Sequence, residues 1–520
     1  MLTAVMILLV VFSNAAGDVF LTKGMKQVGD VSAIGWTKLF STIKQIACNL
    51  NFVLGVACLA ISFFSFLAVL SWANLSFVVP ATAIVYVVTV VGAKFFLGET
   101  VDRLRWGGTL LICLGVALVC IPGDVSLSLA MIAKPLRFFF GVLTIASIGY
   151  YLASIIAAER FFSKSGRGGA NAQGGLPGPV SVLVPLCGAD FNAYRNYASL
   201  CRQDYPQFEI IFGVADPADS SLPLVAKLCA DFPDVAIQKV ISSEEIGPNP
   251  KVNILNNMLS YASHETLLML DSDIRVGSDF LKTICGELGE NGEGLVTCLY
   301  RAGEAPGLPS KLEAAGISSE FAPGVLVAQM GAGISFAFGA SIALTKKTLA
   351  AIGGFAAIAP YLADDYMLGN LVKRAGFPVK LSQCVVETVL SRLTLVGFLK
   401  HQLRWARGIR ACAPWGHTGS VITNGTSLSF LYFAFSGFSR QGLLVFAATV
   451  AVRLWMAWRV AVRRLGDDLL KHNLYLVPLR DFLSLFIWSA ALFGRRVEWR
   501  SRVFRLEKDG KIIPQEISAR

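Results

Sequence analysis

The sequence predicts an α/β domain, built on a mostly parallel sheet with helices on both faces, between two groups of membrane-spanning helices. Of its 520 residues, 54% are apolar and only 16% are charged, which is too apolar for one soluble domain. The long apolar runs gather towards the two ends of the chain. Short strand and helix patterns alternate in the middle, as in sheets whose parallel strands are joined by helices.

Five apolar runs precede the central domain, each close to the length of roughly 20 residues that crosses a bilayer. They cover residues 2–22, 49–71, 75–98, 106–122 and 137–158. The first resembles a secretory signal, but it lacks a positively charged start and further runs follow, so we expect it to be retained. Basic residues follow the first, third and fifth runs, which places the N-terminus outside and the central domain in the cytoplasm. These residues are Lys23, Lys26, Lys38, Lys44, Arg103, Arg105, Arg160, Lys164 and Arg167.

Residues 77–119 resemble one half of a drug/metabolite transporter of the EamA and small multidrug-resistance type. The similarity is greatest at LGE, residues 97–99, and in the glycine-containing apolar stretch after Arg105. It covers residues 1–122 and implies a four-helix membrane unit, with a fifth transmembrane helix in residues 123–162. Such halves normally pair with a second copy, and none is evident in this chain. Transport, anchoring, lipid handling and oligomerisation all stay open, and Glu99 at a span end also fits a solvated loop residue.

Residues 163–179 are rich in glycine, serine and proline, and we expect them to be a linker. The central domain is expected over residues 180–418. Its pattern predicts strands at 180–185, 208–214 and 235–241 and helices at 193–202, 224–232 and 251–262. In sheets of this kind ligands bind at the carboxyl ends of the strands.

The stretch LLMLDSDIRV, residues 267–276, carries the strongest pattern for a functional site. Its four apolar residues predict a buried strand that runs directly into Asp271 and Asp273. Two carboxylates at this spacing can share a hard divalent cation, which keeps positions open for phosphate oxygens. A polar strand end with a helix cap is the alternative for the stretch alone. Polar residues at two other expected strand ends, 187–190 and Asp216, favour a nucleotide site.

Two later segments carry further candidate groups. Residues 361–374 begin a helix with Asp364 and Asp365, which is also ordinary chemistry for a helix N-terminus. Residues 395–410 are a basic amphipathic stretch containing Trp405, which fits a helix lying on anionic lipid.

Taken in order, these segments resemble the family 21 glycosyltransferases. The matching positions are Asp216 in GVADPAD, residues 247–253 (GPNPKVN), Asp271 in LDSDIRV, Asp365 in ADDYM, and the box His401-Gln402-Leu403-Arg404-Trp405. The resemblance covers residues 180–410 and implies a GT-A type fold, which is a Rossmann-like mixed sheet. His401 replaces the glutamine or arginine that opens the family's last box. The transporter-like unit is also foreign to the basic family plan.

The resemblance implies an inverting hexosyltransferase that moves a sugar, glucose favoured, from a UDP-sugar to a lipid hydroxyl. Ceramide is the favoured acceptor, and a bacterial hopanoid-associated branch with similar motifs keeps a hopanoid acceptor open. Asp365 is implied as the general base, with the neighbouring Asp364 as the second candidate, and Asp273 with Asp271 as the ligands of Mg²⁺ or Mn²⁺. The nucleotide sugar would be bound by Asp216, Lys251, Asp271, His401, Arg404 and Trp405.

The C-terminal third predicts further membrane helices over residues 419–494, with apolar runs at about 427–438, 441–458 and 474–494. We favour two crossings, with one run re-entrant or interfacial, because Arg480 and Asp481 lie in the last run and two crossings keep the basic tail, 495–520, inside. The chain would then be a multi-pass protein of the cell inner membrane.

The charge distribution and the cysteine and histidine content speak against a nucleic-acid-binding protein and against a zinc protein. The net charge of +11 comes from basic residues beside apolar runs, which fits a membrane, and we find no nucleic-acid module. Eleven cysteines without a C-x-x-C pair and only four histidines speak against a zinc centre. Two alternatives remain, a processive polysaccharide synthase and a lipid or drug transporter with an inactive enzyme domain.

Overall fold

The computed structural model describes residues 2–28, 45–98, 101–120, 125–163, 178–288, 293–499 and 502–515. It divides into two compact units, Met1–Ile132 and Ala133–Arg520. Several residues used in the predictions lie outside the described part of the chain. They are Lys38, Lys44, Glu99, Lys164, Arg167 and all but the ends of the predicted linker.

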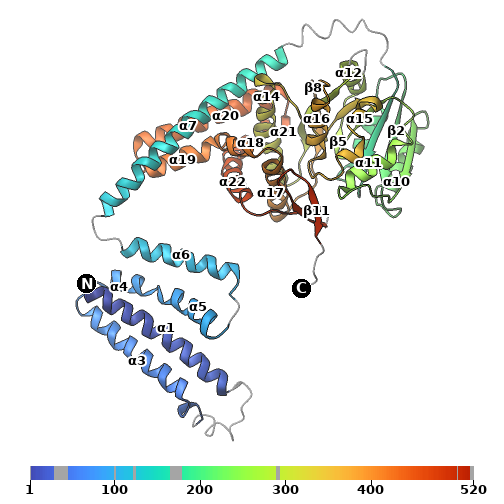
Figure 1. Ribbon diagram of the computed structural model, residues 1–520. Helices are drawn as coiled ribbons and strands as arrows, with labels where there is room; N and C mark the ends of the chain where they lie inside the picture. Colours follow the sequence, from blue (N-terminus) through green and yellow to red (C-terminus); the bar gives the residue numbers. More distant parts are fainter. Residues whose placement is uncertain are drawn as a thin grey trace. The chain divides into compact units, whose positions relative to one another are not determined.

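The first unit is a group of apolar helices (Figure 1). The helices are α1 (Leu2–Val28), α3 (Leu50–Leu70), α4 (Leu75–Thr82), α5 (Val85–Phe96) and α6 (Arg103–Cys120). Helices α1 and α3 pack closely, because a Cβ on Gly17 would lie only 3.1 Å from the carbonyl oxygen of Gly55. Ser62 of α3 also donates a hydrogen bond to the carbonyl of Val10 in α1 (3.0 Å). Small residues therefore bring the two backbones together, as is common between helices in membranes.

Five helices of the described residues are long and apolar enough to cross a membrane: Thr3–Val28, Leu50–Leu70, Leu75–Phe96, Ala133–Ser163 and Arg440–Arg464. They cover four of the five predicted N-terminal runs and one of the three C-terminal runs. Helix α6 occupies the remaining N-terminal run, and its crossing stays a prediction. In the C-terminal part, α19 (Gly425–Phe435) is apolar but has 11 residues, and α22 (Leu476–Ala491) buries Arg480 and Asp481. The preference for two C-terminal crossings likewise stays a prediction.

The long helix α7 (Val125–Ser163), which belongs to the second unit from Ala133 on, and α20 (Arg440–Ala457) pack beside the α/β domain (Figure 1). Tyr151 and Ile155 of α7 and Met456 and Ala457 of α20 join one buried apolar cluster with Leu299 of the domain's sheet. This apolar contact fixes the α/β domain directly against candidate membrane helices.

The α/β domain contains an eight-stranded mixed sheet with the order β3-β2-β1-β4-β7-β6-β8-β5. Strands β3, β2, β1 and β4 are parallel, β7 runs antiparallel to both neighbours, β6 and β8 are parallel, and β5 is antiparallel to β8. The mostly parallel pattern thus holds for the first four strands. The strands are β1 (Val180–Pro185), β2 (Phe208–Val214), β3 (Ala236–Ile241), β4 (Thr266–Met269), β5 (Ile274–Arg275), β6 (Leu295–Glu304), β7 (Ile342–Thr345) and β8 (Val379–Val389).

Helices cover both faces of this sheet. Side chains of neighbouring residues in a strand point to opposite faces, so each face has its own apolar core. Val182 packs in the core with α9 (Ala193–Cys201), α10 (Leu222–Asp231) and α12 (Phe280–Glu287). Leu183 packs in the other core with α11 (Pro250–Leu259), α15 (Lys346–Ala351) and α16 (Asp364–Arg374). The carboxyl ends of β1, β2 and β4 therefore share one edge, where α11 and α16 begin.

The segment predicted as a basic tail contains a three-stranded antiparallel sheet, β9 (Arg496–Trp499), β10 (Arg502–Leu506) and β11 (Ile512–Gln515). It lies beside α17 (Leu395–Cys412), the helix of the basic amphipathic stretch (Figure 1). Cations of α17 bond to this part of the chain, which differs from the expectation that they face lipid. Lys400 pairs with Glu498 (2.9 Å), Arg407 donates to the carbonyls of residues 493 and 496, and Arg410 to those of residues 492 and 494.

Candidate active site

The acidic stretch after β4 forms a tight turn at the carboxyl edge of the sheet. The amide of Ile274 donates to the carbonyl of Asp271 (3.2 Å), so the chain reverses between β4 and β5. Asp273 is tied to β8, because the Thr388 hydroxyl donates to its Oδ2 (2.9 Å) and the Val389 amide to its carbonyl (2.8 Å). The hydroxyl of Ser272 donates to Oδ2 of Asp190 (2.5 Å). The structure thus brings together two of the predicted acidic strand ends.

These carboxylates lie close enough to affect one another's protonation. Burial raises the pKa of Asp273 to about 7, and the carboxylates of Asp271 and Asp190 add to the rise. A group of acids with this property favours a bound cation, which would remove the repulsion.

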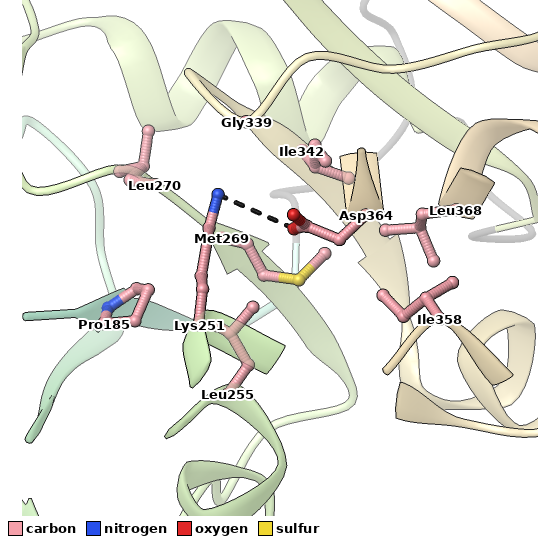
Figure 2. Close-up of a pocket in the computed structure, with 10 residues that line it drawn as sticks. All are labelled: Pro185, Lys251, Leu255, Met269, Leu270, Gly339, Ile342, Ile358, Asp364 and Leu368. Carbon is pink, nitrogen blue, oxygen red and sulfur yellow. Dashed lines mark ion pairs between the residues drawn. The ribbon is translucent and has the colours of Figure 1, made fainter. Parts of the chain in front are cut away.

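Lys251 joins the acids of β4 to those of α16. Its Nζ lies 2.5 Å from Oδ1 of Asp271 and 3.8 Å from Oδ2 of Asp364, and Figure 2 shows it pointing toward Asp364. Burial opposes its charge, but Asp271, Asp364 and Asp365 outweigh burial and raise the pKa of Lys251 above its usual value. The lysine is therefore a fixed positive charge at the centre of the site.

The buried amide of Asn249 places Lys251 at the start of α11. Its Oδ1 accepts hydrogen bonds from the amides of Lys251 (3.0 Å) and Val252 (3.1 Å), as an N-cap does. Its Nδ2 donates to the carbonyl of Tyr361 (2.8 Å) and to Oδ1 of Asp364 (3.3 Å). One side chain thus fixes the start of α11 relative to the start of α16.

The two acids that begin α16 have different surroundings. Asp364 is buried and faces Asn249 and Lys251. Asp365 accepts hydrogen bonds from the amide of Gly339 at Oδ2 (2.9 Å) and from its neighbour Tyr366 at Oδ1 (2.7 Å). Burial raises the pKa of Asp365 to about 6, and the carboxylate of Asp364 adds to the rise. Asp365 is thus ionised at neutral pH but takes up a proton more readily than an ordinary aspartate.

A small pocket, with a cavity volume of about 10 Å³, lies beside Lys251 and Asp364 (Figure 2). The backbone of Gly339 passes over it, where a Cβ would lie 2.7 Å from Oδ2 of Asp271 and 2.8 Å from Nζ of Lys251. Only glycine fits this approach without a shift of the ion pair. The pocket is lined by Pro185, Lys251, Leu255, Met269, Leu270, Gly339, Ile342, Ile358, Asp364 and Leu368.

The last predicted box lies on α17. His401 contacts the buried carboxylate of Glu313 through Nδ1 (3.1 Å), and its ring packs on Trp405 with the centroids 4.4 Å apart. The side chain of Gln402 points inward and accepts a hydrogen bond from Arg480 (2.7 Å). The guanidinium of Arg404 lies over the ring of Trp499, 5.5 Å from its centroid.

Asp216 lies in the exposed loop after β2, as its sequence predicts. Its Oδ1 accepts a hydrogen bond from the amide of Ala218 (2.8 Å), which stabilises the turn. The described contacts join it to its own loop and not to Lys251.

Comparison with known proteins identifies the family of this chain. The sequence model of Glycosyl transferase family 21 matches residues 140–512. The chain belongs to this family.

Curated relatives of this family 21 member are ceramide glucosyltransferases. Ceramide glucosyltransferase 1 of Caenorhabditis elegans is 25% identical over 352 residues, which cover 65% of this chain and 73% of the relative. Ceramide glucosyltransferase 3 of the same organism is 24% identical over 348 residues, with 65% and 75% covered. The chain is a hexosyltransferase, and the predicted α/β domain with a mixed sheet is confirmed by the eight-stranded sheet.

Solved structures also show similarity. The mannosyltransferase PcManGT from Pyrobaculum calidifontis, in complex with GDP-Man and Mn²⁺, is 19% identical, with a TM-score of 0.41 and coverage of 69% of this chain and 99% of that one. S. aureus TarS 1-349 is 14% identical, with a TM-score of 0.29 and coverage of 65% and 99%.

The candidate site also contains residues that the sequence pattern does not mark individually. Asn249 and Asn253 belong to the quoted segment 247–253, and Asn253 accepts the amides of Ile246 and Gly247, which holds the loop before α11. Thr388 and Gly339 come from distant parts of the chain, and no local pattern marks them.

The two predicted metal ligands have suitable chemistry, but the described residues add no third ligating side chain in a suitable arrangement. Within the described residues, no group of three or more His, Cys, Asp or Glu side chains is arranged to hold a metal ion. Asp271 and Asp273 supply the oxygen ligands that Mg²⁺ and Mn²⁺ prefer, and the other positions would be left for phosphate oxygens and water.

Proposed function

We propose that this family 21 member transfers a single sugar, glucose favoured, from a UDP-sugar to the hydroxyl of a lipid, with inversion. The observation that carries the proposal is the joining of Asp271, Lys251 and Asp364 at the carboxyl edge of the sheet, with Asp365 beside them. Ceramide is the favoured acceptor, because the curated relatives are ceramide glucosyltransferases. A hopanoid or another lipid is the second candidate.

The donor diphosphate would lie beside Lys251 and the two acids after β4. Asp271 and Asp273 would hold Mg²⁺ or Mn²⁺, which when bound neutralises charge on the leaving diphosphate. Lys251 adds a positive charge that is already in place before the bond breaks, so little reorganisation is required. The guanidinium of Arg404 would donate two hydrogen bonds to a phosphate of the donor, with His401 and Trp405 beside it. Asp216 would accept a hydrogen bond from the uracil.

Inversion requires a base on the face of the sugar opposite the leaving group, and we assign this role to Asp365. An alcohol is far less acidic than a carboxylic acid, so its proton moves late, as the oxygen attacks. The raised pKa of Asp365, about 6, makes it a better proton acceptor than an ordinary aspartate while it stays ionised at neutral pH. Its hydrogen bonds from Gly339 and Tyr366 fix the carboxylate in position. No covalent intermediate with the enzyme is needed.

The membrane helices support a lipid acceptor. Five described helices have the length and composition of membrane spans, and α7 and α20 pack on the α/β domain itself. A lipid hydroxyl at the interface and a soluble donor from the cytoplasm could then meet at one site. We place the protein in the cell inner membrane with the α/β domain in the cytoplasm.

Mass spectrometry of lipid products tests this function. Membranes containing the wild type or Asp365→Asn would be incubated with UDP-glucose, UDP-galactose or UDP-N-acetylglucosamine, with ceramide added and native lipids present. One hexose on ceramide with wild type alone is the expected result. A sugar on a native polyol lipid would replace ceramide by the hopanoid-type acceptor, and a polymeric product would favour the processive synthase. Absence of transfer to any lipid despite UDP binding would overturn the proposal and favour a transporter with an inactive enzyme domain.

A further inference from the structure

The C-terminal sheet touches two segments that lead into the candidate active site. The first contact joins β9 to α17. Trp499 ends β9, and its ring supports the guanidinium of Arg404 at 5.5 Å from the ring centroid. The adjacent Glu498 pairs with Lys400, one turn earlier on α17 (2.9 Å). Strand β9 therefore runs beside the part of α17 that carries the box of residues 401–405.

The second contact joins the turn between β10 and β11 to the residues just before α16. The amide of Leu362 donates to the carbonyl of Gly510 (3.1 Å), and the amide of Ile512 donates to the carbonyl of Pro360 (2.8 Å). Tyr361 and Lys511 form an antiparallel bridge between these bonds. Because Asp364 begins α16 directly after this segment, the turn helps to fix where Asp364 and Asp365 lie.

The same segment is held from its other side by Asn249, which donates to the carbonyl of Tyr361. It is thus clamped between the start of α11 and the C-terminal sheet. Apolar packing keeps the sheet in place, because Leu362 and Ala411 pack on its buried residues, Val497, Phe504, Leu506 and Ile512.

Gly510 is required at the turn for two reasons. Its φ is +90°, which side chains rarely adopt, and a Cβ would lie 2.5 Å from Sγ of Cys412 on α17. The turn can therefore lie against both α17 and the segment 360–362 only with glycine here.

We propose that the C-terminal sheet is part of the active site of this glycosyltransferase. Trp499 is a positioning residue for Arg404, and the turn at Gly510 positions the segment that carries Asp365. An arginine side chain is long, and an aromatic surface beneath it limits its conformations, so less freedom is lost when it binds a phosphate. This inference rests on the roles proposed for Arg404 and Asp365.

The Trp499 contact is tested on the full chain with the UDP-sugar that the wild type uses. We expect Trp499→Ala to raise KM for the donor about 2- to 30-fold, the range of a cation–π contact, with a smaller change in kcat. Trp499→Phe keeps an aromatic surface and should restore most of the affinity. Glu498→Gln, which removes only the exposed pair with Lys400, is the matched control and should change KM little.

A double variant separates positioning from general damage. In an Arg404→Ala background, Trp499→Ala should raise KM no further, because the group it positions is gone. An unchanged KM in Trp499→Ala would overturn the inference. A second result would also overturn it. If Trp499→Ala and Trp499→Phe raised KM equally, and if this effect added to that of Arg404→Ala, Trp499 would have a structural role alone.

The Gly510 contact is tested with a second glycine of the same backbone conformation. We expect Gly510→Ala to lower kcat about 10-fold or more by displacing Asp365, with the Kd for UDP within about 2-fold of wild type. Gly376 also has φ +90° but open space around it, so Gly376→Ala carries the same backbone strain without the clash. Equal kcat values for the two variants would overturn this part. A wild type without any sugar transfer would instead overturn the proposed function, so the two failures are distinguishable.

Discussion

Lys251 and Asp271 form an ion pair, with 2.5 Å between Nζ and Oδ1, directly beneath the backbone of Gly339. The pair joins the start of α11 to the turn after β4, and a third segment covers it. Because the three segments pack so closely around this ion pair, a side-chain atom added at Gly339 would displace it.

We therefore expect Gly339→Ala to impair the enzyme. The new Cβ would lie 2.7 Å from Oδ2 of Asp271 and 2.8 Å from Nζ of Lys251, so the ion pair must shift. Overpacking of this kind typically costs about 1–3 kcal/mol of stability, and the shift should raise KM for the donor. Thermal unfolding and donor titration measure both effects. Gly331→Ala is the control, because nothing lies within 4 Å of its added Cβ; equal behaviour of the two variants would contradict the prediction.

Asp365→Asn should abolish most turnover while nucleotide binding persists. Removal of a general base typically lowers the rate about 10²–10⁴-fold. The amide is nearly the same size and keeps one oxygen to accept a hydrogen bond from Gly339 or Tyr366, so the fold should stay intact. Steady-state kinetics and UDP titration by calorimetry measure the two effects. Loss of UDP binding together with turnover would show that Asp365 binds the donor or supports the fold instead.

The pH dependence of kcat/KM should report the same carboxylate. Burial and Asp364 raise the pKa of Asp365 from 3.8 to about 6. A base acts only when it is ionised, so activity should rise as pH increases through about 6 and fall as pH drops below it. At saturating Mn²⁺, which favours the ionised form of Asp273, the residual activity of Asp365→Asn should not show this limb. A wild-type profile that is flat from pH 5 to pH 8 would exclude Asp365 as the titrating base.

Parts of this site follow from local sequence pattern. The sequence predicts β1 and β2 with their observed bounds, and strands with a common direction bring their carboxyl ends to one edge. That is why Asp190 and Asp271–273 could be expected near one another. The start of α11 is likewise marked by Asn249-Pro250, an N-cap followed by proline.

Other parts depend on long-range contacts that no local pattern encodes. Gly339 matters only because β7 lies next to β4 and brings the preceding loop over Lys251. The C-terminal strands have four or five residues, and their arginines hide the alternation of Val497 and Trp499, so the segment resembles a solvated tail. The cations of α17 fit a lipid-facing helix, but the carbonyls that Arg407 and Arg410 bind lie more than 80 positions away in the chain.

Metal dependence should trace to Asp273. Chelation with EDTA should stop turnover, and Mn²⁺ or Mg²⁺ should restore it, because the charge on the leaving diphosphate needs a counter-charge. Asp273→Asn removes one charged ligand and should raise the Mn²⁺ concentration that gives half-maximal activity. Asp279→Asn changes an exposed acid nearby and should leave that concentration unchanged. Full activity in EDTA would show that Lys251 and Arg404 stabilise the leaving group without a metal.

Asn249→Ala should lower both stability and kcat, because this buried amide joins two helix starts. The change removes the N-cap of α11 and leaves the carbonyl of Tyr361 and the carboxylate of Asp364 without its donor. Loss of a cap costs about 0.5–2 kcal/mol, and a buried group without its partner about 1–3 kcal/mol, so we expect about 2–4 kcal/mol in total. Denaturant unfolding in detergent measures the loss. Asn370→Ala removes a single bond within α16, to the carbonyl of Tyr366, and should cost about 1 kcal/mol or less. If Asn249→Ala were no more damaging than Asn370→Ala, the placement of α16 would depend on the C-terminal sheet and not on Asn249.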